Sequence, residues 1–413
     1  MKKLLPLLLF FLLLLTHQPG RVSADDFDVA AEHAIAVEAT TGKVLYEKDA
    51  TTPDGVASMT KILTVYMVYQ QIKEGQLSWD TQVDISDYAY DLTANSDASN
   101  VPMEARRYTV EQLVNAAMVA SANSAAIALA EHIAGSEPKF VDMMSQQLKS
   151  WGIKDATLVN ASGLNNSYLG DNIYPGSASD AENLMSARDM AIIARHLITD
   201  FPDVLKISDQ VTADFDGTTM NTYNYMLGGM PYERAGVDGL KTGTTELAGA
   251  SFVATSTENG MRIISVVMNA DGWQDNDYAR FEATNDLLNY VANNFEMVKL
   301  IKTGESYQSH KATVLDGKED SVTAIAKQSL KVVHKQGSDT SNAVTFSTSS
   351  GYTAPIQKGE VVGKATYHDT DLVGTGYLDK APSVDMVAAK DVKKSFFLRV
   401  WWNHFVRYVN DNL

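Results

Sequence analysis

Apolar positions alternate in strand-like runs near both ends of residues 25–295. Residues 33–48 contain two short alternating runs joined by a Thr-Gly turn, which is typical of a β-hairpin. Residues 237–270 contain three more runs of this kind, separated by turn residues. We expect these distant segments to pair in one antiparallel sheet, since each run needs partners to bury its apolar side chains.

Helical patterns fill the middle of the same region. Residues 62–74 are apolar nearly all round in their first half, which indicates a buried helix. Residues 109–134 are rich in alanine and begin with the capping-box pattern Thr-x-x-Gln. Further helices are expected from residue 186 onward and over residues 277–295. Together with the strands, these helices predict an α+β domain over residues 25–295, in which an antiparallel sheet is flanked by helices.

A different pattern follows this domain. Residues 296–388 contain short, regularly spaced alternating runs separated by turns, and they therefore predict a small all-β domain. Residues 389–413 are expected to form an amphipathic helix with a polar face that carries two arginines. Its other face is apolar and mostly aromatic, and comprises Phe397, Leu398, Trp401, Phe405, Tyr408 and Val409.

The terminal helix has the features of a membrane-surface helix. A basic face, an aromatic face and a terminal position are typical of a helix that lies in a membrane interface, and the segment is too polar to span a bilayer. The alternative is a helix packed on the body of the protein, but a protein core rarely needs so many aromatic side chains in one short tail. We therefore expect residues 390–413 to bind a membrane surface.

The N-terminus is typical of an exported protein. Two lysines precede the apolar run Leu4–Leu15, and a polar stretch then ends in Val22-Ser23-Ala24. This is the order of a signal peptide, residues 1–24, and the apolar run is too short to span a bilayer comfortably. We expect cleavage after Ala24, export, and a mature protein held by its C-terminal helix at the outer face of the cytoplasmic membrane.

The amino-acid composition argues against several kinds of functional site and partner. The chain of 413 residues contains no cysteine, which excludes disulfides, cysteine nucleophiles and cysteine-based zinc sites. The eight histidines show no ligand spacing, and no phosphate-binding glycine motif is present, so we expect neither a metal nor another cofactor. The net charge of −17 argues against a nucleic-acid partner.

A candidate nucleophile lies at the start of the first helix. Ser58 and Lys61 form an S-x-x-K pair, and one helical turn places both side chains on the same face. A serine hydroxyl needs a base to take its proton, and a lysine can be that base only if its pKa is lowered by burial or nearby positive charge. A helix cap with a surface lysine gives the same pattern. Ser136-Glu-Pro-Lys139 is a second copy that looks like an ordinary helix start.

Ser121-Ala-Asn123 is the only S-x-N in the chain, and it lies within the helical pattern of residues 109–134. In a continuous helix, residues i and i+2 point in roughly opposite directions, so these two side chains can serve one site only if the helix breaks near residue 120. An unbroken helix with two incidental polar residues is the alternative.

Lys241-Thr242-Gly243, followed by Thr244, lies on one of the predicted strands. The missing side chain of the glycine lets a substrate backbone approach the strand, and the lysine and threonine hydroxyls suit a carboxylate. Lys302-Thr303-Gly304 is a second copy that lacks the strand context.

In this order and on these elements, S-x-x-K, S-x-N and K-T-G resemble the three signatures of penicillin-binding proteins and serine β-lactamases. The layout of export signal, catalytic domain, β-domain and amphipathic tail resembles the low-molecular-mass D-alanyl-D-alanine carboxypeptidases over essentially the entire mature chain. The resemblance implies a serine-type hydrolase that removes the terminal D-alanine from peptidoglycan stem pentapeptides. It also implies covalent inhibition by β-lactam antibiotics.

The resemblance further implies a role for each matching residue. Ser58 is expected to be the acylated nucleophile, Lys61 its general base, and Ser121 the relay that passes a proton to the leaving amine. The backbone N–H groups of Ser58 and Thr244 are expected to form the oxyanion hole. The substrate-binding residues are expected to be Asn123, Lys241, Thr242, Gly243, Thr244 and Arg280.

Three alternatives stay open. A class A β-lactamase needs a separate deacylating glutamate, but residues 155–185 look like loop and Glu182-Asn-Leu-Met gives no convincing motif. A transpeptidase passes the acyl group to an amine instead of water, and the sequence does not distinguish the two acceptors. The third alternative is a wall-binding protein with a vestigial site, against which the three intact motifs argue.

Overall fold

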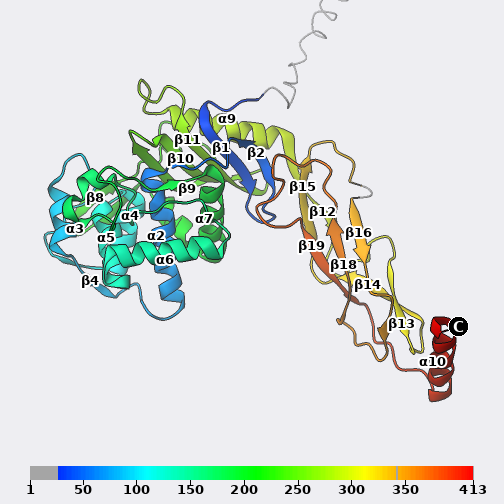
Figure 1. The fold of residues 1–413 in the computed structure, drawn as a ribbon. Coiled ribbons are helices and arrows are strands. Elements are labelled where there is room, and N and C mark those ends of the chain that lie inside the picture. The colour runs from blue at the N-terminus through cyan, green and yellow to red at the C-terminus, as the bar shows by residue number, and fades with distance from the viewer. Residues whose placement is uncertain (1–26, 341–342, 413) are drawn as a thin grey trace, which may run out of the picture.

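The computed structural model describes residues 27–340 and 343–412, so the predicted signal peptide at residues 1–24 lies outside the described residues. Along the chain, a sheet with its helices comes first, an elongated all-β unit follows, and a single helix ends the chain (Figure 1). This order confirms the predicted fold class.

A five-stranded antiparallel sheet forms the centre of the first unit, in the order β2-β1-β11-β10-β9. β1 is Ala31–Glu38 and β2 is Val44–Lys48, so the predicted hairpin is confirmed. β1 also pairs with β11, which joins the two ends of the region as the apolar pattern predicted. The remaining strands are β9 (Val237–Thr245), β10 (Gly249–Glu258) and β11 (Met261–Ala270).

The two faces of this sheet pack against different helices. Successive side chains of a strand alternate between faces, so Ile35 joins one hydrophobic cluster and Ala36 the other. α7 (Ala187–Asp200) lies on one face of the sheet, together with the remaining helices of this unit. α9 (Ala279–Asn294) covers the opposite face (Figure 1). The sheet is therefore buried between two layers of helix.

The helical layer surrounds α2 (Lys61–Lys73), whose residues are buried up to Tyr69, as the all-round apolar pattern predicted. The segment 109–134 forms two helices, α4 (Val110–Val119) and α5 (Asn123–Ala134). The other elements of this layer are short, apart from α6: η1 (Ala57–Thr60), α3 (Asp87–Asp91), η2 (Leu92–Ala94), α6 (Glu137–Ser150), η3 (Asn166–Tyr168), η4 (Gly170–Asn172), η5 (Pro202–Val204) and α8 (Leu205–Ser208).

Three two-stranded ribbons complete the first unit. Each pairs segments that the apolar pattern did not mark as strands, because so few residues are involved in each ladder. The pairs are β3 (Asp54–Gly55) with β6 (Leu184–Met185), β4 (Gln82–Asp84) with β5 (Arg107–Thr109), and β7 (Thr212–Phe215) with β8 (Thr218–Asn221).

The second unit is all-β, as predicted, and has its own hydrophobic core. β12 (Phe295–Ile301) pairs with β15 (Leu330–Lys335), and a six-stranded sheet has the order β16-β18-β19-β14-β13-β17. The strands of this sheet are β13 (Lys311–Leu315), β14 (Ser321–Ala326), β16 (Val344–Ser347), β17 (Tyr352–Thr353), β18 (Val361–Tyr367) and β19 (Ser383–Ala388).

A buried ion pair fixes the second unit to the first. Lys43, next to β2, places Nζ 2.7 Å from Asp369 Oδ2 in the segment between β18 and β19. The same lysine donates to the Val333 carbonyl, and Tyr377 donates its hydroxyl to Asp369. Because this charge pair is enclosed and hydrogen-bonded, separating the two units would leave each charge without its partner.

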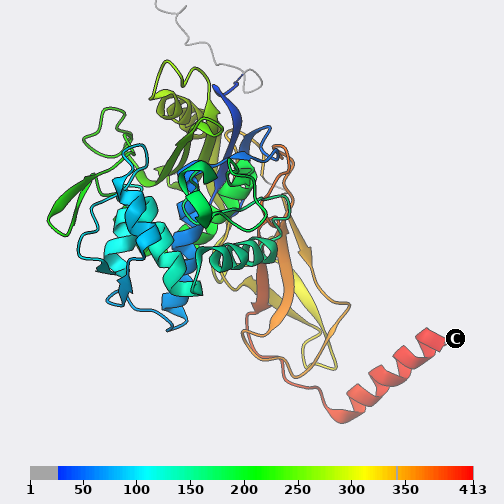
Figure 2. The same cartoon turned by 60° about the vertical axis from the view of Figure 1, so that its left-hand side comes forward.

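The C-terminal helix, α10, spans Phe397–Asn412. It begins later than the expected boundary at residue 389, because the preceding residues belong to the β-unit. Val392 is buried in the core of that unit and forms a bridge with Ile356. α10 extends away from the β-unit at the end opposite the first unit (Figure 2). Among the described residues, no helix is long and apolar enough to cross a bilayer.

Candidate active site

The first pair of site residues stands where a short 3-10 turn runs into α2. Ser58 lies in η1 and Lys61 opens α2, and Lys61 Nζ is 2.9 Å from Ser58 Oγ. Ser58 is half-buried, whereas Lys61 has no exposed surface. The two side chains therefore meet as the S-x-x-K spacing predicted, and Lys61 is not the surface lysine of the alternative interpretation.

Lys61 Nζ has two further oxygen neighbours. It lies 2.7 Å from Asn123 Oδ1 and 2.7 Å from the carbonyl oxygen of Ser162. Burial lowers the pKa of Lys61 well below its usual range, and the positive charge of Lys241 lowers it further. The surroundings thus favour the neutral amine.

The neighbouring oxygens determine where the lone pair of a neutral Lys61 amine points. It has two N–H groups and one lone pair, and the oxygens of Asn123 and Ser162 can only accept hydrogen bonds. If both N–H groups are donated to these two oxygens, the lone pair is left for the hydroxyl hydrogen of Ser58. The arrangement is that of a base held ready beside a nucleophile.

The alanine-rich helix breaks at the S-x-N motif, as the functional interpretation of that motif predicted. Ser121 adopts φ +57° between the end of α4 and the start of α5, and its side chain is buried. Asn123 donates its N–H and its Nδ2 to the Ser99 carbonyl, each at 2.9 Å. Asn123 thus opens α5, where its Oδ1 meets Lys61 Nζ.

The K-T-G motif lies in β9, the edge strand next to η1. Lys241 and Thr242 are buried, whereas Thr244 is exposed. Burial lowers the pKa of Lys241 to about 7, and the charge of Arg280 contributes to the lowering. The charge of Lys241 in turn lowers the pKa of Lys61. β9 also lies against the turn that carries Ser58, because a Cβ on Gly243 would meet Val56 and Ala57, so the two motifs meet at one place.

The glycine of K-T-G lies against the turn that carries Ser58, a contact that the sequence did not predict. A Cβ on Gly243 would lie 2.7 Å from the Val56 carbonyl oxygen and 3.3 Å from the Ala57 Cβ. Its missing side chain therefore makes room for η1, which carries Ser58. The predicted approach of a substrate backbone to this strand stays a prediction.

Arg280 stands beside the same strand. It lies in the first turn of α9 and donates to the Gly243 carbonyl at 2.8 Å and to Thr244 Oγ1 at 2.7 Å. Burial lowers its pKa to about 10, so the guanidinium stays charged at neutral pH. Arg280 therefore contacts Thr244, another of the residues expected to bind the substrate, and its part in substrate binding stays a prediction.

The segment 159–163 is the part of the site that the sequence did not reveal. It lies in a region predicted only as loop, and Asn183 holds it by accepting from the N–H groups of residues 159 and 160. Asn183 Nδ2 also donates to Thr60 Oγ1 in η1. Glu182 accepts from Thr245 Oγ1 in β9. A backbone acceptor such as the Ser162 carbonyl carries no residue-type signal, so no motif could have found it.

The duplicate motifs are not part of this site. Ser136 occupies the N-cap of α6 without a side-chain capping bond among the described residues, and Lys139 is exposed. Lys302 is exposed after β12, and its Nζ lies 3.7 Å from Glu305. Neither copy brings its lysine to a buried partner within the described chain.

Two small hollows flank the site. One, of about 210 Å³, is lined by Thr242, Thr244 and Arg280 among others, and the other, of about 260 Å³, by Asn100 and Ala120 among others. Tyr223 and Tyr225 line both hollows. A substrate can therefore approach beside the K-T-G strand and beside the residue that precedes Ser121.

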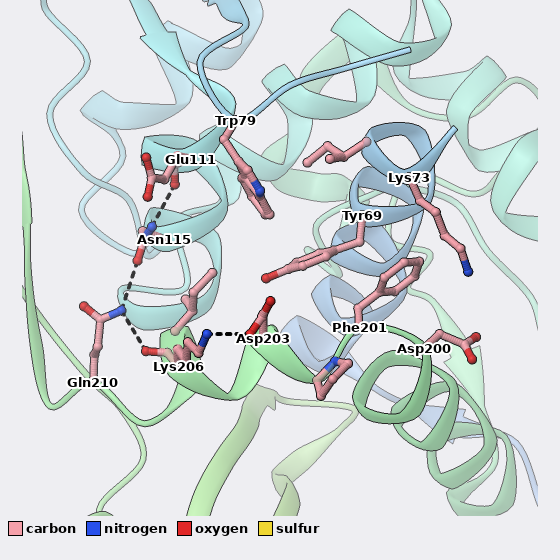
Figure 3. A pocket seen from close by; sticks show the side chains of 13 residues that line it. Tyr69, Lys73, Trp79, Glu111, Asn115, Asp200, Phe201, Asp203, Lys206 and Gln210 are labelled. Carbon is pink, nitrogen blue, oxygen red and sulfur yellow. Dashed lines mark hydrogen bonds and ion pairs between the residues drawn. The ribbon is translucent and has the colours of Figure 1, made fainter. Parts of the chain in front are cut away.

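A cavity of about 700 Å³ lies at the other end of α2 (Figure 3). Tyr69, Trp79 and Phe201 line it together with Asn115 and Gln210, which share a hydrogen bond. Eight residues at a rise of 1.5 Å place Tyr69 about 12 Å along the helix from Lys61. The cavity is separate from the site of the three motifs.

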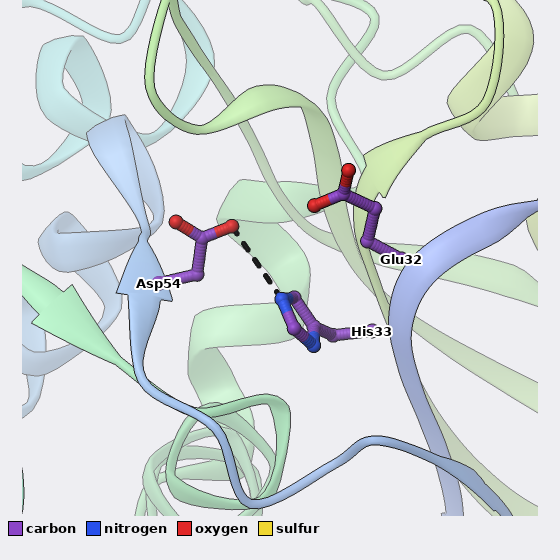
Figure 4. A group of neighbouring side chains, drawn as sticks. All are labelled: Glu32, His33 and Asp54. Carbon is purple, nitrogen blue, oxygen red and sulfur yellow. Dashed lines mark ion pairs between the residues drawn. The ribbon is translucent and has the colours of Figure 1, made fainter.

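Glu32, His33 and Asp54 form another cluster, whose side-chain nitrogen and oxygen atoms lie within 4.8 Å of one another (Figure 4). His33 Nδ1 is 3.0 Å from the Asp49 carbonyl oxygen, and Nε2 is 3.6 Å from Asp54 Oδ2. These contacts tie the start of β1 to β3, the segment that leads to η1. The site described above does not use them.

Family comparisons agree with this geometry. The family model described as D-alanyl-D-alanine carboxypeptidase matches residues 18–272, and the one described as penicillin-binding protein 5, C-terminal domain, matches residues 295–394. D-alanyl-D-alanine carboxypeptidase DacF of Bacillus subtilis is 28% identical over 411 residues, which cover 96% of this chain and 96% of the relative.

Solved structures give the same result. A peptidoglycan synthesis regulatory factor from Streptococcus pneumoniae is 54% identical with a TM-score of 0.84, over 89% of this chain and 100% of that chain. Penicillin-binding protein D2 from Listeria monocytogenes, solved in ampicillin-bound and cefotaxime-bound forms, is 28% identical with a TM-score of 0.53, over 64% of this chain and 98% of that chain. The chain belongs to the serine-type D-alanyl-D-alanine carboxypeptidase family of low-molecular-mass penicillin-binding proteins.

Proposed function

We propose that the protein removes the terminal D-alanine from peptidoglycan stem pentapeptides through an acyl-enzyme on Ser58. The observation that carries the proposal is the buried amine of Lys61, 2.9 Å from Ser58 Oγ with two further acceptors at 2.7 Å. As Oγ attacks the carbonyl carbon between the two D-alanines, its proton moves to Lys61 and the C–N bond breaks. Water then releases the shortened peptide from Ser58.

The other motif residues act on the leaving group and on the peptide. Ser121 passes a proton to the departing D-alanine amine, and the backbone N–H groups of Ser58 and Thr244 stabilise the oxyanion. Asn123 Oδ1 accepts a hydrogen bond from Lys61, and Nδ2 donates one of its hydrogens to the Ser99 carbonyl. The second Nδ2 hydrogen is therefore the one left for the substrate peptide.

The terminal carboxylate of the substrate binds beside β9. Lys241 supplies positive charge, and Thr242 and Thr244 supply hydroxyl donors. Because Thr244 Oγ1 accepts from Arg280, its own hydroxyl hydrogen is directed away from the guanidinium and toward the carboxylate. Arg280 thus acts chiefly by orienting Thr244.

β-Lactams acylate the same serine in this proposal. The similar Listeria monocytogenes protein has been solved with ampicillin and cefotaxime, which supports this extension. The match to the C-terminal domain of penicillin-binding protein 5 favours a carboxypeptidase over a β-lactamase.

We further propose that the mature chain is exported and lies on the outer face of the cytoplasmic membrane, with α10 in the interface. The aromatic side chains of α10 are exposed, and Trp401 is 64% exposed and Phe405 48%. An exposed apolar face of this size on a terminal helix is what membrane-surface binding requires.

Mass spectrometry of a pentapeptide ending in D-Ala-D-Ala tests the proposed reaction. We expect the wild-type protein to give tetrapeptide and D-alanine, and both Ser58→Ala and Lys61→Ala to give neither. Lys302→Ala, in the duplicate K-T-G, is the control and should match wild type. A transfer product with an added amine would identify a transpeptidase, and an unchanged pentapeptide with wild type would contradict the proposal.

A further inference from the structure

A buried carboxylate stands behind the segment that orients Lys61. Glu137 opens α6 and is 3% exposed, and it lies inside the duplicate motif Ser136-x-x-Lys139, which the reaction does not use. Its Oε1 accepts the N–H of Ala161 at 2.8 Å, and its Oε2 accepts the hydroxyl of Tyr88 at 2.8 Å. Burial raises the pKa of Glu137 to about 7, against the lowering effect of these two hydrogen bonds.

The residue that Glu137 contacts is held from both sides. The N–H of Ala161 goes to Glu137, and its carbonyl accepts from Thr64 Oγ1 at 2.7 Å. Thr64 lies one helical turn after Lys61 in α2. The next residue, Ser162, presents its carbonyl to Lys61 Nζ. The two hydrogen bonds that hold Ala161 therefore also fix the direction of the Ser162 carbonyl, which accepts a hydrogen bond from Lys61 Nζ.

We propose that Glu137 is a positioning residue for the general base. Through Ala161 it holds the Ser162 carbonyl in place, and the carbonyl in turn aims the lone pair of Lys61 at Ser58. The proposal deepens the function proposed above and rests on the roles given there to Ser58 and Lys61. Without the carboxylate, the N–H of Ala161 is buried with no acceptor, and the segment 160–163 must shift to find one.

The rate of acylation by a fluorescent penicillin tests this role. Varying the penicillin concentration separates the dissociation constant of the first complex from the rate constant of acylation. Glu137→Ala should lower the rate constant about 10- to 100-fold, the size expected when a reacting group is misplaced by about 1 Å. The dissociation constant should stay within about 2-fold, because Glu137 does not touch the residues that bind the carboxylate.

Conservative variants distinguish positioning from general destabilisation. Glu137→Gln keeps an oxygen acceptor for Ala161 and should stay within about 3-fold of the wild-type rate constant. Tyr88→Phe is the matched control, because it removes the other hydrogen bond of the same carboxylate and leaves Ala161 untouched; it should also stay within about 3-fold.

Each outcome decides the proposal. A wild-type rate constant in Glu137→Ala overturns it, as does a loss in Glu137→Gln as large as in the alanine variant. If circular dichroism shows that Glu137→Ala does not fold, Glu137→Asp replaces it; its shorter side chain withdraws the acceptor, and a wild-type rate constant there also overturns the proposal. A wild-type protein that penicillin does not acylate would overturn the proposed function itself, and this inference with it.

Discussion

Burial and like charge set the protonation of the two lysines in the site. The oxygens around Lys61 Nζ are uncharged, and besides burial it is the positive charge of Lys241 that lowers the pKa of Lys61. Lys241 is in turn influenced by Arg280. Burial, reinforced by this series of cations, lowers the pKa of each lysine. In the proposed mechanism, one lysine then acts as a base while the other keeps enough charge to bind a carboxylate.

The two lysines predict a bell-shaped pH dependence of kcat/KM. A base must be deprotonated, so activity rises as Lys61 loses its proton, at a pH well below the usual range of lysine. A carboxylate-binding ammonium must be protonated, so activity falls as the pH rises through about 7, the pKa of Lys241. The measurement is kcat/KM for the pentapeptide over a range of pH.

Lys241→Arg is the matching variant for the falling limb. A guanidinium stays protonated far above neutral pH, so the residual activity of this variant should fall only at higher pH than in wild type. A falling limb at the same pH in both proteins would show that another group controls it.

Among the helices and strands, those with a regular apolar periodicity were predicted from the sequence. Features that depend on contacts between distant segments were not. The apolar alternation of β1 and the periodicity of α2 were enough to predict both elements, since each buries a repeating set of side chains. The break between α4 and α5 contains neither Gly nor Pro. Its cause is tertiary, because the donors of Asn123 find their acceptor at Ser99 in a distant loop.

The sequence predicted those parts of the site that consist of side chains in recognisable motifs. The order of the three motifs predicted Ser58, Lys61 and Lys241. Lys61 contacts Ser58, and the strand that carries Lys241 lies against the turn that carries Ser58. The Ser162 carbonyl and the carboxylate of Glu137 were not predicted. One is a backbone group and the other acts through a backbone group, so neither has a characteristic spacing in the sequence.

The packing of the loop segment 159–163 against η1 gives a prediction of stability. Gly163 has φ +84°, and a Cβ there would lie 1.8 Å from the Ala57 carbonyl oxygen. Gly152 has almost the same conformation, φ +85°, but a Cβ there would meet no other atom within 4 Å. Alanine at either position carries the left-handed backbone cost of about 1–2 kcal/mol, but only Gly163→Ala also creates a clash.

Thermal unfolding of the two variants measures the difference. Gly163→Ala should be at least about 2 kcal/mol less stable than Gly152→Ala, because the clash cannot be relieved by a flexible side chain. For a domain of this size, this difference lowers Tm by about 4–8 °C. Equal Tm values would show that η1 and the loop move apart without cost.

At the scale of the whole molecule, the β-unit separates the active site from α10 (Figure 1). α10 contacts the β-unit through its polar residues: Arg407 and His404 bind Asp316, which is 5% exposed. The hydrogen bonds of Asp316 to these two side chains lower its pKa, although burial opposes them. These two side chains thus hold the helix to the protein, and the aromatic side chains of the helix are exposed.

Removal of α10 should separate membrane binding from catalysis. The deletion belongs after Ser395, because Val392 is part of the β-unit core. We expect the mature chain to sediment with vesicles that contain anionic lipid, and the chain ending at Ser395 to stay in solution with unchanged carboxypeptidase activity. Trp401→Glu combined with Phe405→Glu should give the same loss of binding while α10 stays in place. A full-length mature chain that does not bind vesicles would contradict the membrane role.

The intact mass of the protein after reaction with benzylpenicillin shows whether Ser58 forms an acyl-enzyme. We predict that wild type gains the mass of one penicillin molecule, that peptide mapping places it on Ser58, and that Ser136→Ala reacts equally. Ser58→Ala should gain nothing, and Lys61→Ala should gain it far more slowly than wild type. An adduct of undiminished yield in Ser58→Ala, or none in wild type, would contradict an acyl-enzyme on Ser58.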